Sequence, residues 1–175
     1  VEEQGETIDS LYQVNTFGPF YIAKVANNFK IPFVHISTNY VFDGLKDTYF
    51  EDDQPNPINL YGASKLAGEQ LVKIATKQYY IIRTSTLFGS KKSTKGTDFI
   101  TKMLELTSKG EVIKVVDDQT MSPTLSPDLA KKIYEVTEKL PSFGIYHITN
   151  SGNASWFKFA QEIFIIKINL VQFDI

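Results

Sequence analysis

The chain has 175 residues, 42% of them hydrophobic and 22% charged, with 18 basic and 20 acidic side chains and a net charge of −2. These values predict one soluble globular domain with enough apolar material for a core, and the scattered, nearly balanced charges exclude the basic stripe that a nucleic-acid partner needs. Cysteine is absent, which excludes disulfides and thiolate chemistry and makes a cytoplasmic location the default, and no apolar run is long enough to predict a membrane span.

Helices and short apolar strands alternate along the chain. Apolar residues recur at helical spacing from Thr7 to Asn28, and Pro32 marks the change to a strand at 33–37. The alternation continues with helices at about 59–77, 98–109, 126–140 and from 154, and with strands at 79–83, 112–116 and 145–148. Apolar strands between amphipathic helices indicate parallel pairing with helices on both faces. We therefore predict an α/β fold, a doubly wound parallel sheet of the Rossmann-like type.

Long loops follow the carboxyl ends of three predicted strands, at 38–57, 84–96 and 117–125. Ligands bind outside those ends in open α/β sheets, so the loops predict a site there, unless they merely tolerate insertions. The acidic run 51–53 is interpreted as solvated rather than as a Mg²⁺ site, because three adjacent carboxylates cannot all face one ion. His35 and His147 have no partner at ligand spacing, so we expect core or turn histidines and predict no metal site. The aromatic residues Trp156, Phe157, Phe159 and Phe164 are interpreted as the core of the last helix.

Tyr61 and Lys65 stand four residues apart in the segment NPINLYGASKLAGEQLV. The spacing alone is weak evidence, because about one Tyr-x-x-x-Lys pair is expected by chance in this composition. The segment has a helical pattern with Asn59 as a candidate N-cap, so both side chains are predicted on one face of the first turn. An ammonium at about 4 Å attracts a phenolate by about 4 kcal/mol at an effective dielectric constant of about 20. Tyr61 could then give a proton to a carbonyl oxygen as hydride reaches its carbon.

Thr38 follows the predicted strand 33–37 and places a hydroxyl at the expected edge of the sheet. Such a hydroxyl could donate to the alkoxide that develops during reduction of a carbonyl group. Ordinary strand-end and turn hydrogen bonding is the alternative for Ser37 and Thr38.

Five ordered segments, VHISTNYVFDG, YGASKLAGEQLV, IIRTSTLFG, DDQTMSPT and ASWFKFAQEIF, resemble the dTDP-4-dehydrorhamnose reductase family of the extended short-chain dehydrogenase/reductase superfamily. The resemblance runs in order from about Glu2 to Phe164. It implies reduction of the 4-keto group of a nucleotide-linked deoxysugar by NADPH or NADH, giving dTDP-L-rhamnose for cell-surface polysaccharide. By motif match, it implies Tyr61 as proton donor, Lys65 as the residue that binds the nicotinamide ribose and tunes Tyr61, and Thr38 as the third member of the triad.

The resemblance also implies roles outside the triad. Asn39 occupies the slot of an aspartate that touches the sugar, and Asn15 matches a helix asparagine that supports the lysine and its water. Thr86 stands where the family often has a tryptophan against the sugar or base, which puts that stacking contact in doubt. Dehydratases of the superfamily carry an acid pair directly after the threonine. Asn39 and Tyr40 stand there in this chain, so we expect reduction rather than elimination.

The family's phosphate-binding turn, G-x-x-G-x-x-G, is absent, because none of the ten glycines stand two or three residues apart. We therefore expect residues 1–175 to form a single partial Rossmann-like domain, without the N-terminal βαβαβ half and truncated in the substrate region after about residue 164. Strand 33–37 would then lie at a bare edge of the sheet. Without the anion site for the cofactor, we expect this chain alone to be inactive.

A non-catalytic binding subunit of the same fold is the alternative function, similar to the regulatory subunit of methionine adenosyltransferase. The partners that the resemblance implies are a nucleotide-sugar substrate and, as a candidate assembly, a homodimer. The residues that would select NADH or NADPH belong to the half expected to be missing.

Overall fold

The computed structural model describes residues 7–89, 98–109 and 112–171, with only the backbone for 167–171. The contacts within the chain divide it into two compact units. The first comprises Val1–Thr84 with Glu135–Ile148, and the second comprises Ser85–Tyr134 with Thr149–Ile175. Within the described ranges, no helix is long and apolar enough to cross a membrane.

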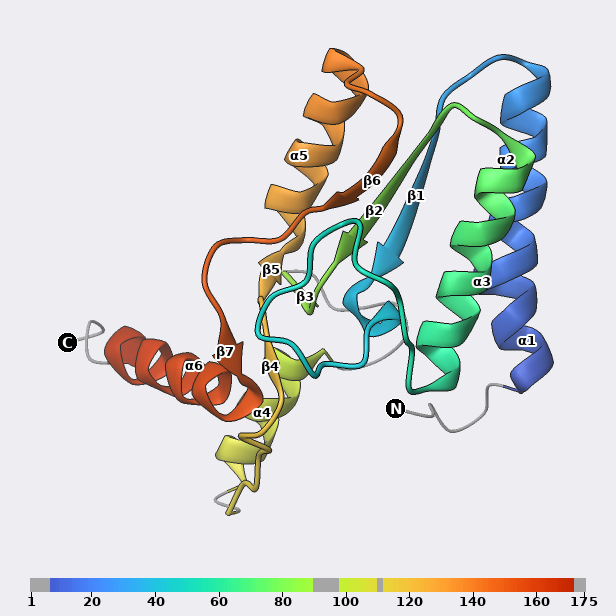
Figure 1. Cartoon of the computed structure of the whole chain (residues 1–175). Coiled ribbons are helices and arrows are strands. Elements are labelled where there is room, and N and C mark those ends of the chain that lie inside the picture. The colour runs from blue at the N-terminus through green and yellow to red at the C-terminus, as the bar shows by residue number, and fades with distance from the viewer. Residues whose placement is uncertain (1–6, 90–97, 110–111, 172–175) are drawn as a thin grey trace. The chain divides into compact units, whose positions relative to one another are not determined.

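The first unit is built on a parallel sheet of three strands in the order β1-β2-β6 (Figure 1). The strands are β1 (Phe33–Thr38), β2 (Tyr79–Thr84) and β6 (Gly144–His147). In register, Thr38 lies opposite Thr84, and Arg83 lies opposite His147. Three predicted strands and their parallel pairing are therefore confirmed, and among the described strands β1 pairs with β2 alone, at one edge of the sheet.

The segment predicted as one helix, residues 7–28, is helical but contains a wider turn. Helix α1 (Ile8–Tyr12) begins after the N-cap Thr7, whose hydroxyl oxygen accepts from Ser10 N at 3.2 Å. A π-helical segment, η1 (Gln13–Phe17), follows, and α2 (Gly18–Asn28) completes the segment. Amphipathic periodicity does not distinguish a π turn from an α turn, so the sequence pattern predicted a continuous helix.

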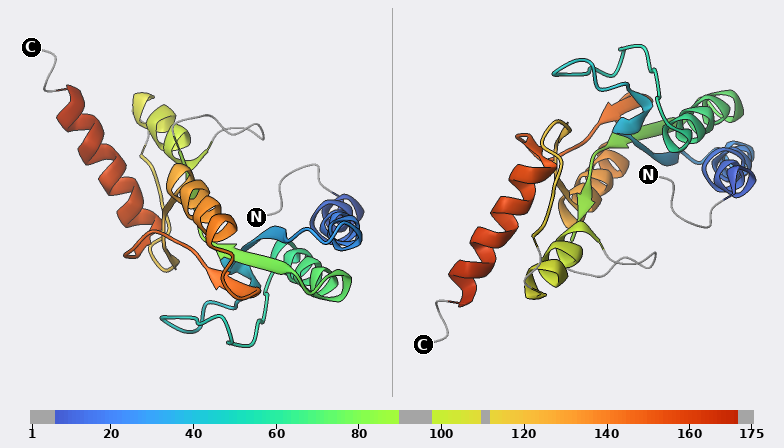
Figure 2. Two further views of the ribbon diagram at one scale, coloured as in Figure 1. Left: turned by 90° about the horizontal axis from the view of Figure 1, so that it is seen from above. Right: turned by 90° about the horizontal axis from the view of Figure 1, so that it is seen from below.

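Helices α2 and α3 (Leu60–Ala75) lie side by side on the same side of the sheet (Figure 2). Ala23 of α2, Val72 of α3 and Ile81 of β2 are fully buried and form the core of this unit. Partly buried apolar side chains surround them, namely Phe33, Ala75, Tyr79 and Ile145. Ala23 and Val72 therefore attach the two helices to the sheet, whereas the larger apolar side chains Tyr21, Ile22 and Val25 of α2 are exposed.

Gly68 allows α3 to approach η1 closely. A Cβ atom added at Gly68 would lie 2.2 Å from the main-chain oxygen of Asn15, a separation that real Cβ atoms do not show. The backbone of η1 therefore occupies the space that any larger residue at this position would need.

We expect Gly68→Ala to lower the free energy of unfolding by about 2 kcal/mol, although alanine is favoured over glycine inside a helix by about 1 kcal/mol. The steric cost exceeds the propensity gain because the obstacle is backbone and cannot rotate away. Urea denaturation followed by circular dichroism measures the difference. Gly144→Ala is the matched control, because a Cβ there meets nothing within 4 Å. Equal stability of Gly68→Ala and the unsubstituted chain would contradict the close contact.

The second unit contains short strands and helices. Its strands pair as β3 (Leu87–Phe88) with β5 (Thr124–Leu125), parallel, and as β4 (Thr120–Met121) with β7 (Ala154–Ser155), antiparallel. Its helices are α4 (Phe99–Ser108) and α6 (Trp156–Val171), and α5 (Ser126–Lys139) begins in this unit and ends in the first. Met103, Ala160 and Ile163 form the core between α4 and α6.

The predicted strand at 112–116 is not present, and this prediction was wrong. Ile113 and Val115 pack against the α4–α6 core while Val112 and Val116 are exposed, so the alternation typical of a strand is kept. No described strand pairs with the segment, although Val116 O accepts from Phe157 N at 3.0 Å. A strand requires a hydrogen-bonded neighbour as well as an alternating pattern, and only the pattern can be read from the sequence.

The aromatic residues of the last helix contribute to the core with one exception. The ring of Phe99 lies 4.7 Å from that of Trp156 and is stacked on Phe159 at 5.6 Å, measured between centroids. Phe164 also packs against the core, whereas Phe157 is exposed. The core interpretation is therefore wrong for Phe157, whose helix position turns it toward solvent.

Candidate functional site

The end of β1 and the first turn of α3 meet in the first unit. Thr38 is the last residue of β1, and the short 3₁₀ turn η2 (Asn39–Val41) follows it. The ring of Tyr40 in η2 makes an edge contact with the ring of Tyr61, with centroids 6.0 Å apart. A Cβ atom added at Gly62 would lie 2.1 Å from Tyr40 O, so glycine is needed for this approach. The structure therefore brings the predicted Thr38 and Tyr61 segments together.

Tyr61 lies in the first turn of α3. The predicted N-cap is confirmed, because the side-chain oxygen of Asn59 accepts from Gly62 N at 2.7 Å. The cap fixes where the helix begins and thereby the direction of the side chains in its first turn. Tyr61 is 39% exposed, so its side chain remains accessible from solvent.

Lys65 connects α3 to β1. Its ammonium group donates to the main-chain oxygen of Ile36, two residues before Thr38. Burial lowers the pKa of Lys65, and the nearby charge of Glu69 opposes this shift. The cation is therefore held at the carboxyl end of β1 in a partly desolvated environment.

The hydroxyl of Thr38 makes local hydrogen bonds. Its oxygen accepts from Tyr40 N at 3.2 Å, which caps η2, and it donates weakly to the side-chain oxygen of Asn39 at 3.4 Å. The turn hydrogen bonding that the sequence allowed for Thr38 is thus present in the structure. Thr38 is buried and Asn39 is partly exposed.

Asn15 lies in η1, next to α3. Its side-chain amide donates to the hydroxyl oxygen of Ser64 at 3.1 Å, and the neighbouring Thr16 hydroxyl donates to Ser64 O at 2.7 Å. Ser64 immediately precedes Lys65 in the chain. π-helical turns are frequent at functional sites, and this one places the predicted Asn15 beside the helix turn that carries Lys65.

Thr86 belongs to the second unit and is not among the residues that the first unit brings together. Its main-chain oxygen accepts from Thr124 N at 3.0 Å, and its φ of 35° is unusual for a residue with a β-branched side chain. Part of its predicted loop, residues 90–96, lies outside the described residues.

A buried ion pair lies beside the site, and the sequence patterns did not predict it. Glu69 is completely buried, and Arg83 donates to its two carboxylate oxygens at 3.0 and 2.7 Å. The hydroxyl of Ser37 donates to the same carboxylate at 2.5 Å. Two signals could have suggested the pair, since Arg83 is the single arginine of the chain and sits in an apolar strand, and Glu69 follows Lys65 by four residues.

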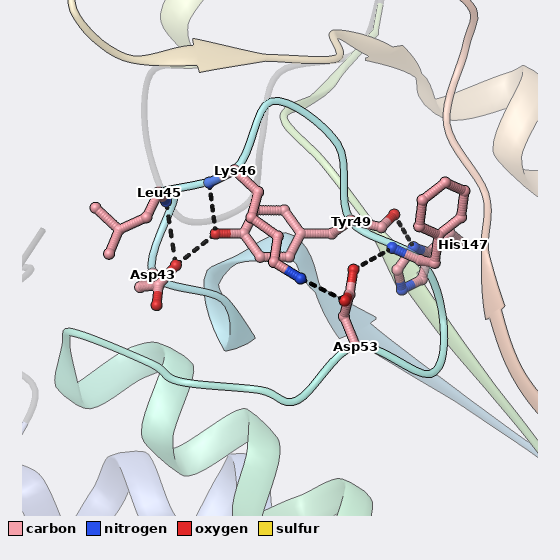
Figure 3. Close-up of polar contacts among 7 residues, drawn as sticks. Asp43, Leu45, Lys46, Tyr49, Asp53 and His147 are labelled. Atoms are coloured by element: carbon pink, nitrogen blue, oxygen red, sulfur yellow. Dashed lines mark hydrogen bonds and ion pairs between the residues drawn. The ribbon is translucent and has the colours of Figure 1, made fainter.

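The loop after η2 is ordered by hydrogen bonds to its own side chains (Figure 3). Asp43 accepts from Leu45 N at 3.1 Å, from the Tyr49 hydroxyl, and from the Asn56 amide at 3.0 Å. These bonds, led by that of Tyr49, lower the pKa of Asp43 to about 2. Lys46 forms an ion pair with Asp53. These contacts give the loop a defined shape, whereas the sequence predicted only that a long loop is present here.

The same loop is attached to the end of β6 at His147 (Figure 3). Glu51 accepts from His147 N at 3.0 Å, and Tyr49 O lies 3.2 Å from the Nδ1 atom of His147. Glu51 and Asp53 of the acidic run have separate protein partners, and the groups described in the structure include no cluster that could hold a metal ion. His35 is buried within β1, as expected of a core histidine.

Comparison with known proteins decides the family. A model of the RmlD substrate binding domain matches residues 1–168. The chain belongs to the RmlD substrate binding domain family. This RmlD-family chain is 40% identical over 164 residues to the spore coat polysaccharide biosynthesis protein SpsK of Bacillus subtilis. It is 36% identical over 170 residues to a dTDP-4-dehydrorhamnose reductase of Aggregatibacter actinomycetemcomitans.

The relatives of the RmlD-family chain are longer than the chain itself. The two alignments cover 93% and 94% of this chain but 56% of each relative. The chain therefore spans about half the length of the curated relatives it matches.

Solved structures confirm the predicted α/β fold of the RmlD-family chain. The crystal structure of dTDP-4-dehydrorhamnose reductase from Bacillus anthracis in complex with NADP matches with 40% identity and a TM-score of 0.84, over 92% of this chain and 56% of that one. A dTDP-4-dehydrorhamnose reductase from Clostridium acetobutylicum matches with 38% identity and a TM-score of 0.84, over 91% of this chain and 55% of that one. The family resemblance inferred from the five sequence segments is thereby confirmed.

Proposed function

We propose that the protein carrying this chain is an NAD(P)H-dependent nucleotide-sugar 4-ketoreductase, which reduces dTDP-4-dehydrorhamnose to dTDP-L-rhamnose for polysaccharide biosynthesis. The observation that carries the proposal is the meeting of Tyr61, Lys65 and the end of β1. Relatives named dTDP-4-dehydrorhamnose reductase support the substrate class. A cytoplasmic location, a homodimer and a single partial domain over residues 1–175 remain predictions.

In this proposal Tyr61 is the proton donor. Its hydroxyl gives a proton to the C4 carbonyl oxygen of the sugar while the carbonyl carbon is reduced, so the C=O group becomes CH–OH. The ammonium of Lys65, in the next turn of the same helix, stabilises the phenolate that remains. A proton from solvent then restores the Tyr61 hydroxyl.

The neighbouring polar groups orient the sugar and the lysine. The Thr38 hydroxyl donates a hydrogen bond to the carbonyl oxygen of the sugar. To do so, it must give up its present hydrogen bond to the side chain of Asn39. Asn39 accepts from a sugar hydroxyl, and a contact of Thr86 with the sugar remains a prediction. Asn15 supports Lys65 from η1, next to the Ser64 hydroxyl that its amide already contacts.

The described residues fit one end of a nicotinamide cofactor. Lys65 and Tyr61 are hydrogen-bond donors suited to ribose hydroxyls, and they lie at the carboxyl end of β1, where open α/β sheets bind nucleotides. When bound, NADPH or NADH supplies the hydride for the reduction. Since the sequence contains no glycine-rich phosphate turn, we expect the 175-residue chain alone to bind NADPH poorly and to be inactive. Isothermal titration with micromolar binding by the chain alone would contradict that expectation.

Elimination of water is a less suitable reaction for this site. It needs a general acid and a general base on the sugar side, and Asn39 and Tyr40 stand at the positions after Thr38 where an acid pair would be required. Neither side chain is a carboxylic acid, so reduction is the reaction that these residues support.

We expect Tyr61→Phe to lower the kcat of the whole protein by about 100-fold or more, because the substitution removes the proton donor and keeps the ring. Oxidation of NADPH in the presence of dTDP-4-dehydrorhamnose, followed by absorbance, measures the effect. Tyr21→Phe is the matched control, since Tyr21 lies exposed on α2 and should retain full activity.

The same assay separates the reductase from a non-catalytic subunit. Turnover that depends on Tyr61 supports the reductase. Absence of turnover in both the unsubstituted protein and Tyr61→Phe, with unchanged binding to a protein partner, would instead favour the regulatory alternative.

A further inference from the structure

We propose that Glu69, held by Arg83, is a positioning residue for the Thr38–Tyr61–Lys65 site, an inference that rests on the proposed function. Glu69 is attached to both elements that carry this site, namely α3 with Tyr61 and Lys65, and β1 with Thr38. It lies on α3, one turn after Lys65, and it is hydrogen-bonded to β1 one residue before Thr38.

The carboxylate of Glu69 joins three elements of the first unit. The Ser37 hydroxyl on β1 and the Arg83 guanidinium on β2 both donate to it, the latter through two hydrogen bonds. Bidentate arginine–carboxylate pairs have a fixed planar geometry, so they hold their elements at a defined distance and angle. Thr38 is therefore fixed relative to α3, because its neighbour Ser37 is attached to that helix.

The burial of this pair is energetically expensive. Glu69 is completely buried and Arg83 is 3% exposed, and a well-packed apolar pair is often at least as stable as a buried ion pair. The ion pair therefore needs an explanation other than stability. Specification of one arrangement of β2 against α3 is such an explanation, because slippage of β2 would leave two buried charges unpaired. β1 is held in the same arrangement, because it pairs with β2 and its Ser37 hydroxyl donates to Glu69.

Glu69 also supplies negative charge next to Lys65. Burial lowers the pKa of Lys65, and the charge of Glu69 raises it again. On β1, the ionisable group near Lys65 is His35. Burial lowers the pKa of this histidine and thereby favours its neutral form. Arg83 and Lys73 are further cations that interact with Glu69. The charge of Glu69 therefore opposes the effect of burial on the pKa of Lys65 and favours its charged form.

Glu69→Gln tests the inference, because it keeps the size of the side chain and removes its charge. Nuclear magnetic resonance of the Lys65 side chain in the whole protein, recorded over a pH series, gives the pKa of Lys65 without substrate. We expect this pKa to fall below that of the unsubstituted protein. We also expect kcat to fall about tenfold or more with KM for the sugar changed less than about twofold, and the alkaline limb of the pH–rate profile to move to lower pH.

Two further variants keep the test decisive. If Glu69→Gln alone does not fold, the double variant Glu69→Gln/Arg83→Met removes both charges and leaves none unpaired, and the pKa of Lys65 should fall in it as well. Ser37→Ala is the matched control for charge, because it breaks the contact to β1 and leaves the anion in place. It should reduce kcat without changing the pKa of Lys65.

The outcomes distinguish this inference from the proposed function. An unchanged pKa of Lys65 and an unchanged pH–rate profile in a folded Glu69→Gln protein that still turns over would overturn the positioning role while the reductase assignment stands. Absence of turnover in the unsubstituted protein would overturn the reductase assignment, and a lowered pKa of Lys65 in Glu69→Gln would still support the electrostatic role of Glu69.

Discussion

Replacement of Arg83 by methionine is expected to lower the free energy of unfolding by about 3–5 kcal/mol. The substitution leaves the carboxylate of Glu69 completely buried without its counter-charge, and among the described residues only the Ser37 hydroxyl would still donate to it. It also removes the guanidinium from its position 5.1 Å above the centroid of the Phe42 ring. Urea denaturation at neutral pH, followed by circular dichroism, measures the loss.

The double variant Arg83→Met/Glu69→Leu separates the cost of an unpaired charge from the value of the pair. Because both charges are then removed, we expect most of the lost stability to return. The ion pair of the exposed Lys46 with Asp53 provides the matched control, and Lys46→Met should leave stability nearly unchanged. A double variant as unstable as Arg83→Met would show that the site depends on packing rather than on charge pairing.

Acidification is expected to destabilise the first unit through His35, between about pH 6.5 and about pH 4. Burial, followed by the charge of Lys65, lowers the pKa of His35 to about 4, whereas Glu69 acts in the opposite direction. Within this window the unfolded chain binds a proton that the folded chain does not, so stability falls as the pH falls. The contribution is complete above the unfolded pKa, and its loss amounts to about 3 kcal/mol for this histidine.

His35→Leu should remove most of this pH dependence, since leucine is apolar and does not titrate. The Nε2 atom of His35 has no hydrogen-bond partner among the described residues, so the substitution breaks no bond at that atom. Free energies of unfolding measured in urea from about pH 7 to about pH 5 give the slopes. Burial also lowers the pKa of His147, which leaves a smaller slope in the variant. Identical slopes for both proteins would contradict the assignment to His35.

Local signals in the sequence determined the helix and strands around the site and the positions of the site residues on that helix. The apolar periodicities predicted β1, β2 and β6 and the course of α3, and the Asn59 cap predicted where α3 begins. The positions of Tyr61 and Lys65 on one helix face followed from these, because capping and periodicity act within a few residues. The ordered motifs also identified the family, which the comparisons confirm.

Contacts between distant segments were decided by the tertiary structure alone. The pairing of Glu69 with Arg83 joins a helix to a strand, and the π segment η1 is accommodated because Gly68 lets α3 approach the backbone of Asn15. The segment 112–116 kept a strand pattern and still formed no described strand, because a strand also needs a neighbour. The sequence by itself determined the strands and the helix that carry the proposed site, and which family the chain resembles. Docking of those elements decided which groups are buried together, because desolvation and hydrogen-bond geometry depend on neighbours far away in the chain.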